Sequence, residues 1–249
     1  MNLLRDRSRH GAPAGTVLPS ARGAANGRNI GELLFKLTYR TTVVGGQFVP
    51  RVGPVIVAAN HIGFLDGPLL FSASPRPLHL VAKSELFKPP ANRLLAACGQ
   101  IPLIYDSPDW AAVQEAVNVL EAGRALGIFP EAHRGLGNFG RMRHGIAYLY
   151  ARTRTPIVPA AVFGTRVTGM GKDALPRPRS QLTVVFGEPF RPEIAGDRRK
   201  RSVLAELAER IRQQLRDHLQ TAAELAHEPL PTDDTALATE RALARERNR

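Results

Sequence analysis

Short apolar segments alternate with longer segments of helical period, and this alternation constrains the fold more than any other feature of the sequence. The apolar segments lie at 55–59, 78–82, 101–105, 125–129, 157–163 and 182–186. The helical segments between them lie at 65–72, 84–97, 109–122 and 144–152. Near-continuous apolar strands separated by helices are typical of a sheet that is buried on both faces. The sequence therefore predicts an α/β fold with a central mixed, mostly parallel sheet flanked by helices.

Segments of different composition flank this alternating region. Residues 1–28 contain five arginines and one aspartate without an apolar period, which predicts a basic disordered arm. Residues 29–44 show the period of an amphipathic helix, and a last helix is expected at 198–220. We therefore expect one α/β domain over 29–222 that includes the N-terminal amphipathic helix, followed by a C-terminal tail at 223–249.

The amphipathic segment at 29–44 has two alternative partners. Its apolar residues share one face at helical spacing, namely Ile30, Leu33, Leu34 and Leu37. This face either packs on the core of the domain or lies in the interface of a membrane. Charged residues interrupt the segment, so it is too polar to span a bilayer. The first residues also lack the apolar stretch of a secretory signal, and we expect peripheral attachment at the cytoplasmic face of the cell membrane.

The chain is strongly basic, with 34 Lys and Arg against 22 Asp and Glu and a formal net charge of +12. Nucleic-acid binding is disfavoured, because only 6% of the residues are aromatic and no recognition-helix pattern occurs. The charge and the amphipathic segment together favour an anionic membrane surface as partner. The single cysteine, Cys98, cannot form an intramolecular disulfide, and no Cys/His cluster has zinc-site spacing. We expect no metal and no resident cofactor.

A histidine and an aspartate follow the apolar segment at 55–59. His61 lies in the loop after this predicted strand, and Asp66 lies in the first turn of the next predicted helix. Open α/β sheets place their functional sites at the carboxyl ends of strands. At this spacing the Asp66 carboxylate can hold one ring nitrogen of His61 and leave the other as a proton acceptor. The pair predicts an oriented general base.

A second polar cluster follows the apolar segment at 125–129. It reads Pro-Glu-Ala-His-Arg-Gly, and its charged members are Glu131 and Arg134. Two polar clusters at the same edge of a sheet are expected to converge on one site. Glu131 and Arg134 therefore either belong to that site or form a structural ion pair within the loop.

Four short blocks occur in a fixed order along the chain. They are His61 to Asp66, then Gly99-Gln-Ile-Pro, then Phe-Pro-Glu131, then Ile-Val-Pro159. In this order the blocks resemble the glycerophospholipid acyltransferase family, and in particular bacterial 1-acylglycerol-3-phosphate acyltransferases. The resemblance covers about residues 33–190, and the first and third blocks are the most specific.

The resemblance implies transfer of a fatty acyl group from acyl-CoA or acyl carrier protein to the hydroxyl of a lysophospholipid. The acceptor that it implies is 1-acylglycerol-3-phosphate, which would give phosphatidic acid in phospholipid biosynthesis. His61 would be the general base and Asp66 would orient it. A neutral imidazole suits the removal of an alcohol proton near neutral pH. No Gly-x-Ser-x-Gly elbow occurs, so no covalent enzyme intermediate is expected.

The resemblance also implies substrate-binding roles. Glu131 and Arg134 stand at the charged positions of the third block, with Arg134 suited to hold an acceptor phosphate. Relatives carry an arginine shortly after the position of Gly99, and Tyr105 most nearly replaces it here. The other residues expected at the substrate site are Lys83, Gly99, Tyr105 and Pro159. The replaced arginine leaves the acceptor head group open, as the acyl chain length and the acyl donor also are.

Some alternatives remain at this point. The cations Lys83, Arg141 and Arg143 either line the site or lie on solvated surface. The protein as a whole is an acyltransferase, a hydrolase of the same acyl substrates, or a non-catalytic lipid-binding relative. Turnover of an acyl thioester with and without lysolipid separates these three functions, because only transfer requires the acceptor.

Overall fold

The structure of the protein, a computed structural model, describes residues 18–104 and 109–233. The strands are β1 (Arg40–Val44), β2 (Val55–Ala59), β3 (Leu78–Lys83), β4 (Ile101–Leu103), β5 (Ala125–Ile128), β6 (Ile157–Phe163) and β7 (Gln181–Phe186). The α-helices are α1 (Ala21–Thr38), α2 (Asp66–Ala73), α3 (Ala91–Ala97), α4 (Trp110–Glu121), α5 (Gly145–Thr153) and α6 (Arg201–Ala226). Two short 3-10 helices are η1 (Gly46–Phe48) and η2 (Ser84–Phe87).

Within the described residues, the strands form one seven-stranded sheet in the order β1-β7-β6-β2-β5-β3-β4. The five strands from β6 to β4 run parallel to one another. Strand β7 pairs antiparallel with β6, and β1 pairs parallel with β7, so these two strands run against the rest. The predicted α/β fold with a mixed, mostly parallel sheet is confirmed.

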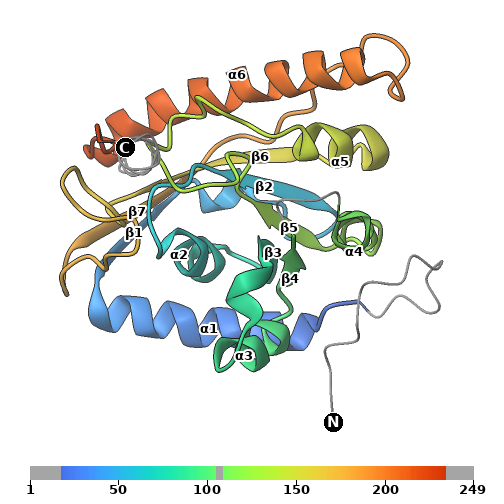
Figure 1. The fold of residues 1–249 in the computed structure, drawn as a ribbon. Helices are drawn as coiled ribbons and strands as arrows, with labels where there is room; N and C mark the ends of the chain where they lie inside the picture. The colour runs from blue at the N-terminus through green and yellow to red at the C-terminus, as the bar shows by residue number, and fades with distance from the viewer. Residues whose placement is uncertain (1–17, 105–108, 234–249) are drawn as a thin grey trace, which may run out of the picture.

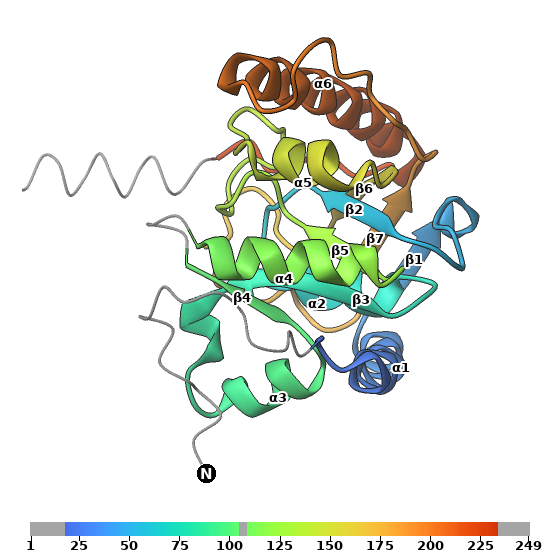
Figure 2. The ribbon, with the colours of Figure 1, turned by 90° about the vertical axis from the view of Figure 1, so that its right-hand side faces the viewer.

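Helices cover both faces of the sheet. One face packs against α4, α5 and α6, and the other packs against α1 and α2. Figure 1 shows α6 and α1 on opposite sides of the sheet. Figure 2 shows α3 on the same side as α1, away from α6. Successive side chains of a strand point to opposite faces, and in β2 all five residues are buried, which explains its unbroken apolar sequence.

The predicted helix at 29–44 is wrong in its boundaries. Helix α1 begins at Ala21 and ends at Thr38, so residues 21–28, which the composition predicts to be disordered, are helical. Ser20 caps the helix by accepting a hydrogen bond from the Gly23 N–H at 3.0 Å. Residues 40–44 form strand β1 instead of the last helical turn, because their β-branched side chains suit the sheet edge beside β7.

The face that α1 turns to the protein consists mainly of small residues, with Phe35 near its end, and not of leucines. Gly23, Gly27 and Gly31 recur every fourth residue and allow close approach of α2 and of the end of α3. The apolar stripe instead faces outward, with exposed fractions of 56–73% for Ile30, Leu33, Leu34 and Leu37. The interpretation that this stripe packs on the core is therefore wrong.

Two other predicted helices have different boundaries. The segment 84–97 is split into η2 and α3, because Pro89 and Pro90 lie between them and proline cannot continue a helix. Helix α6 begins three residues later than expected and continues to Ala226, into the segment predicted as a tail. Its apolar side, which includes Leu207, Ile211 and Leu215, is buried against the sheet. Residues 234–249 of that tail and residues 1–17 lie outside the described residues.

Candidate active site

Three polar loops meet at one edge of the sheet. Strands β6, β2 and β5 are parallel neighbours in the order of the sheet, so their carboxyl ends lie together. The loop after β2 carries His61, the loop after β5 carries Glu131 and Arg134, and the loop after β6 carries Thr165 and Arg166. This edge is the place where parallel α/β sheets hold their sites. The sheet order therefore assembles a site from segments that are far apart in the sequence.

His61 and Asp66 are in direct contact. The Nδ1 atom of His61 lies 2.7 Å from Oδ2 of Asp66. The same oxygen accepts hydrogen bonds from the backbone N–H groups of Ile62 at 2.6 Å and Gly63 at 2.8 Å. Asp66 is fully buried at the first residue of α2, where the helix dipole favours a negative charge. Because the carboxylate accepts the Nδ1–H bond, Nε2 of His61 is left as the acceptor.

Further contacts hold the face of the His61 ring and the backbone of His61. Its ring stacks on Phe129 with 4.3 Å between the ring centroids. Glu131 Oε2 accepts the His61 backbone N–H at 2.8 Å, and Glu131 Oε1 accepts the Phe139 N–H at 2.9 Å. The Gly135 N–H donates to the His61 carbonyl at 3.0 Å. Glu131 therefore fastens the His61 loop to the loop after β5.

Arg134 makes an ion pair, though not with Glu131. Its Nη1 lies 2.7 Å from Oδ1 of Asp173 and donates to the Lys172 carbonyl at 2.9 Å. Its guanidinium carbon lies 5.9 Å from the centre of the Phe64 ring. The side chain of Arg134 is 28% exposed and that of Asp173 is 82% exposed, so the pair is open to solvent. Arg134 thus lies at the same edge of the sheet as His61, and its side chain is partly exposed to solvent.

The other predicted substrate residues are not all brought to this edge. Lys83 ends β3 at the same edge and pairs with Glu85 at 3.3 Å, with both side chains about half exposed. Gly99 precedes β4 and therefore lies at the opposite edge, where a Cβ would come within 2.7 Å of the Ser20 carbonyl oxygen. Pro159 lies inside β6 and lines a cavity of about 410 Å³ beneath α6. Tyr105 lies outside the described residues.

The sequence interpretation missed three residues that complete the site. The Thr165 hydroxyl donates to Oδ1 of Asp66, which gives that carboxylate a fourth partner. Asn60 is buried and links β2 to β6 by two hydrogen bonds to the backbone of Val162, of 2.7 and 3.1 Å. Arg166 is fully buried and bonds to the Gly135 carbonyl at 2.9 Å. The signal that could have identified Thr165 and Arg166 is a Thr-Arg pair directly after the buried strand β6.

No group of three or more His, Cys, Asp or Glu residues is placed to hold a metal ion within 18–104 and 109–233. The chemistry that the arrangement supports is proton transfer. The Nε2 atom of His61 can accept a proton, and its 19% exposed side chain reaches solvent at the edge. The buried Asp66 stabilises the imidazolium that proton uptake creates.

Comparison with known proteins identifies the family. A family model described as Acyltransferase matches residues 40–163. A 1-acyl-sn-glycerol-3-phosphate acyltransferase of Borreliella burgdorferi is 32% identical over 127 residues, which cover 49% of this chain and 51% of the relative. The chain belongs to the glycerophospholipid acyltransferase family. The matched residues of this family model include the His61–Asp66 pair and the Glu131 loop but end before Thr165 and Arg166.

Two further likenesses concern an uncharacterized relative and a solved structure. An uncharacterized protein of Mycobacterium tuberculosis is 30% identical over 185 residues, covering 65% of this chain and 46% of the relative. The crystal structure of the 1-acyl-sn-glycerophosphate acyltransferase PlsC from Thermotoga maritima superimposes with a TM-score of 0.56. It shares 23% identity, and the match covers 77% of this chain and 79% of that one, which supports the fold. The chain spans about half the length of the curated relatives that it matches.

Proposed function

We propose that this acyltransferase moves a fatty acyl group from a thioester of coenzyme A or acyl carrier protein to the hydroxyl of a lysophospholipid. The acceptor that we favour is 1-acylglycerol-3-phosphate, which the Borreliella relative carries in its name. The observation that carries the proposal is the contact between His61 and Asp66, which leaves Nε2 of the imidazole free to accept a proton at the open edge of the sheet.

In the proposed reaction His61 works first as a base and then as an acid. Nε2 takes the proton of the acceptor hydroxyl while the hydroxyl oxygen attacks the thioester carbonyl and forms a C–O bond. The C–S bond of the resulting tetrahedral species then breaks, and the departing thiolate takes the proton back from His61. Asp66 holds Nδ1–H throughout and stabilises the imidazolium between the two steps. No covalent enzyme intermediate is needed, because the acyl group passes directly from sulfur to oxygen.

Cationic side chains at the same edge suit an acceptor that bears a phosphate. Lys83 is the last residue of β3 and Arg134 lies in the loop after β5, and each pairs with a carboxylate that is exposed to solvent. Arg141 and Arg143 are exposed in the loop that follows Glu131. An incoming phosphate can displace Asp173 from Arg134, because solvent-exposed ion pairs are worth at most about 1 kcal/mol. We propose that Arg134 and Lys83 help to hold this phosphate.

The outward apolar stripe of α1 favours an enzyme that acts at a membrane surface. The lysolipid and the diacyl product both partition into bilayers, so an enzyme that acts on them benefits from contact with the membrane. No helix in the described part of the chain is long and apolar enough to span a bilayer. We propose that Ile30, Leu33, Leu34 and Leu37 enter the headgroup boundary of an anionic membrane at its cytoplasmic face.

Replacement of His61 by alanine tests the proposal. The expected loss of acyl transfer is about 10² to 10⁴-fold, which is the usual contribution of a general base. The assay measures thiol release and diacyl product from an acyl thioester with and without lysolipid. His227→Asn is a matched control, because His227 is exposed beyond α6 and Asn tolerates its positive φ of 53°.

Three results would contradict the proposed function. Full transfer by a folded His61→Ala protein removes His61 from the reaction. Equal thiol release with and without lysolipid indicates a hydrolase. Binding of both substrates by the wild-type chain without any turnover indicates a lipid-binding relative.

A further inference from the structure

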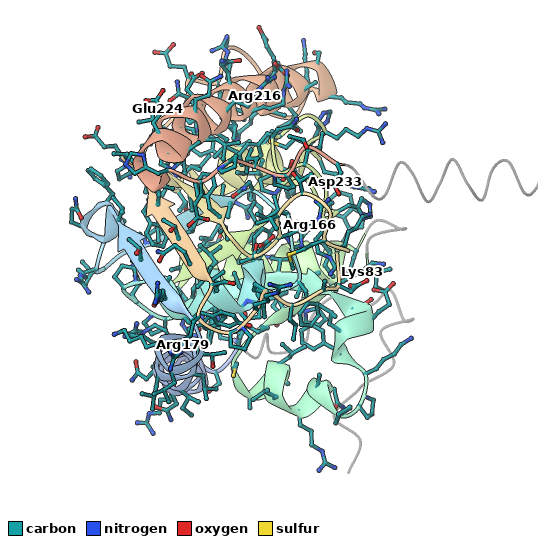
Figure 3. All side chains as sticks on the ribbon, turned by 90° about the vertical axis from the view of Figure 1, so that its left-hand side faces the viewer. Lys83, Arg166, Arg179, Arg216, Glu224 and Asp233 are labelled. Atoms are coloured by element: carbon teal, nitrogen blue, oxygen red, sulfur yellow. The ribbon has the colours of Figure 1, made fainter. Side chains whose placement is uncertain are left out.

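The chain returns to the active-site edge after its last helix. Helix α6 ends at Ala226, and residues 227–233 then run back toward the carboxyl ends of the strands. Leu230 packs against the main core on the way. Figure 3 shows Asp233 beside Arg166, on the side where Lys83 lies, whereas Glu224 lies near the other end of the molecule. A segment that is remote in sequence thus reaches the loops that hold His61.

Arg166 connects this returning segment to two active-site loops. Its side chain is fully buried, and its Nε donates to the Met170 carbonyl at 3.0 Å. Its Nη1 donates to the Gly135 carbonyl at 2.9 Å. Its Nη2 lies 2.8 Å from Oδ1 of Asp233 and also donates to the Asp233 carbonyl. A buried guanidinium needs both hydrogen bonds and a counter-charge, and Asp233 supplies the charge.

Asp233 also holds the loop after β6 directly. Its Oδ2 accepts the Gly169 N–H at 2.9 Å, so each carboxylate oxygen has a partner. The neighbouring Thr232 N–H donates to Oγ1 of Thr168 at 3.1 Å. These contacts attach the 164–170 loop to the segment after α6, and Arg166 attaches the same loop to Gly135. The geometry of that loop therefore depends on the segment that follows α6.

Two hydrogen bonds connect the 164–170 loop and Gly135 to the His61–Asp66 pair. Thr165, next to Arg166, donates to Oδ1 of Asp66. Gly135, whose carbonyl accepts from Arg166, donates its own N–H to the His61 carbonyl at 3.0 Å. We propose that Asp233 is a positioning residue for acyl transfer: through Arg166 it keeps Thr165 on Asp66 and Gly135 on His61. This inference rests on the proposed function of the His61–Asp66 pair.

The test compares Asp233→Ala with Glu224→Ala. Both variants remove one carboxylate near the C-terminal end of the described chain, but Glu224 is exposed on α6 and has no assigned role in the site. We expect kcat to fall about ten- to hundredfold in Asp233→Ala, since small misplacements of catalytic groups have effects of this size. The KM for the acyl thioester should change less than about twofold, because the segment contacts the loops that hold His61 and Asp66 and no residue that we propose binds the thioester. Glu224→Ala should match the wild type.

A double variant separates positioning from simple stability. Asp233→Ala leaves the buried Arg166 without a counter-charge, which can lower the melting temperature. Arg166→Met in the same chain removes that unpaired charge and should restore the melting temperature, but it cannot restore the link to Gly135. We therefore expect the double variant to stay slow. Recovery of the wild-type kcat, or a kcat of Asp233→Ala that falls only with its folded fraction, would overturn the inference.

A spectroscopic measurement tests the inference without turnover. The proton that bridges His61 Nδ1 and Asp66 should give a downfield NMR signal, assigned by its absence in His61→Ala. We expect this signal to shift or broaden in Asp233→Ala and to stay unchanged in Glu224→Ala. An unchanged signal in Asp233→Ala would overturn the inference even if the wild type transfers acyl groups. A wild type with the signal but without transfer would instead overturn the proposed function.

Discussion

His61 is oriented by contacts to its ring and to its backbone, and the loop after β5 contributes to both sets. The ring is held by Asp66 and stacks on Phe129, while the backbone is held by Glu131 and Gly135. A general base must keep one tautomer and one direction to be effective. The two carboxylates therefore have distinct roles, since Asp66 contacts the ring and Glu131 contacts the backbone N–H.

Arg134→Ala measures what the exposed ion pair with Asp173 does in the reaction. If Arg134 holds the acceptor phosphate, its loss should raise the KM for a phosphate-bearing acceptor about ten- to hundredfold, because a charge-assisted contact is worth about 1.5 to 3 kcal/mol. The KM for the acyl thioester should change less. Steady-state kinetics with each substrate varied in turn provides the measurement.

Asp173→Asn is the control for this prediction. It weakens the ion pair but leaves Arg134 in place, so the KM for the acceptor should fall or stay unchanged. A lower melting temperature of Arg134→Ala with unchanged kinetics would show that the ion pair is only structural.

Helix α1 presents a small-residue face to the protein and an apolar face to the outside. Gly23→Ala should destabilise the fold by about 1 to 3 kcal/mol through overpacking, because a Cβ there would lie 1.8 Å from the Ala97 carbonyl oxygen. Gly145→Ala, at the start of α5, has no atom within 4 Å of its Cβ. It should stabilise the fold by up to about 1 kcal/mol through helix propensity. Urea unfolding of both variants measures the two changes in the free energy of unfolding. Equal changes would contradict the packing described for α1.

The outward face of α1 should bind anionic vesicles in a salt-dependent manner. Replacement of Leu33 and Leu34 by Glu should release the protein in vesicle sedimentation, because apolar contact and attraction to the lipid charge both weaken. Leu225→Glu is the control, since Leu225 is a similarly exposed leucine on α6. Equal binding of the wild type to neutral and anionic vesicles would contradict the electrostatic part, and equal binding of all variants would exclude α1 as the contact.

His79, which is buried, and His218, which is partly buried, make the stability of the whole fold depend on pH. Burial lowers the pKa of His79, whose Nδ1–H donates to the Gly99 carbonyl at 2.7 Å. Burial also lowers the pKa of His218, whose Nε2–H donates to the Val185 carbonyl at 3.0 Å. Below about pH 6.5 the unfolded chain takes up protons that the folded chain does not, so stability is present above this pH and is lost as the pH falls.

The free energy of unfolding between about pH 7 and about pH 5 should therefore decrease by at most about 1.4 kcal/mol per pH unit for each histidine. Denaturant unfolding at a series of pH values measures this slope. His218→Gln keeps an N–H donor and removes the titrating group, so its slope should be smaller than that of the wild type. A wild-type slope of zero would show that neither burial affects folding.

Most of the fold could be predicted because its signals are local. Strands such as β2 and β6 are continuous apolar runs, and the periods of α4 and α6 are visible in a few turns of sequence. Strand β1 was missed, since a five-residue edge strand after a helix has too few residues to show its own period. The geometry of His61 and Asp66 was also predictable, because one loop and one helical turn are enough to bring the two side chains together.

The remaining site residues depend on the order of the strands, which no local pattern of sequence contains. Thr165 reaches Asp66 only because β6 lies beside β2 in the sheet. Gly99 was grouped with His61 by sequence similarity, yet it lies at the opposite edge because it precedes its strand instead of following it. Asp233 meets Arg166 because the chain turns back after α6. Sequence therefore determined which segments become strands and helices, while tertiary pairing between distant residues decided which side chains share the site.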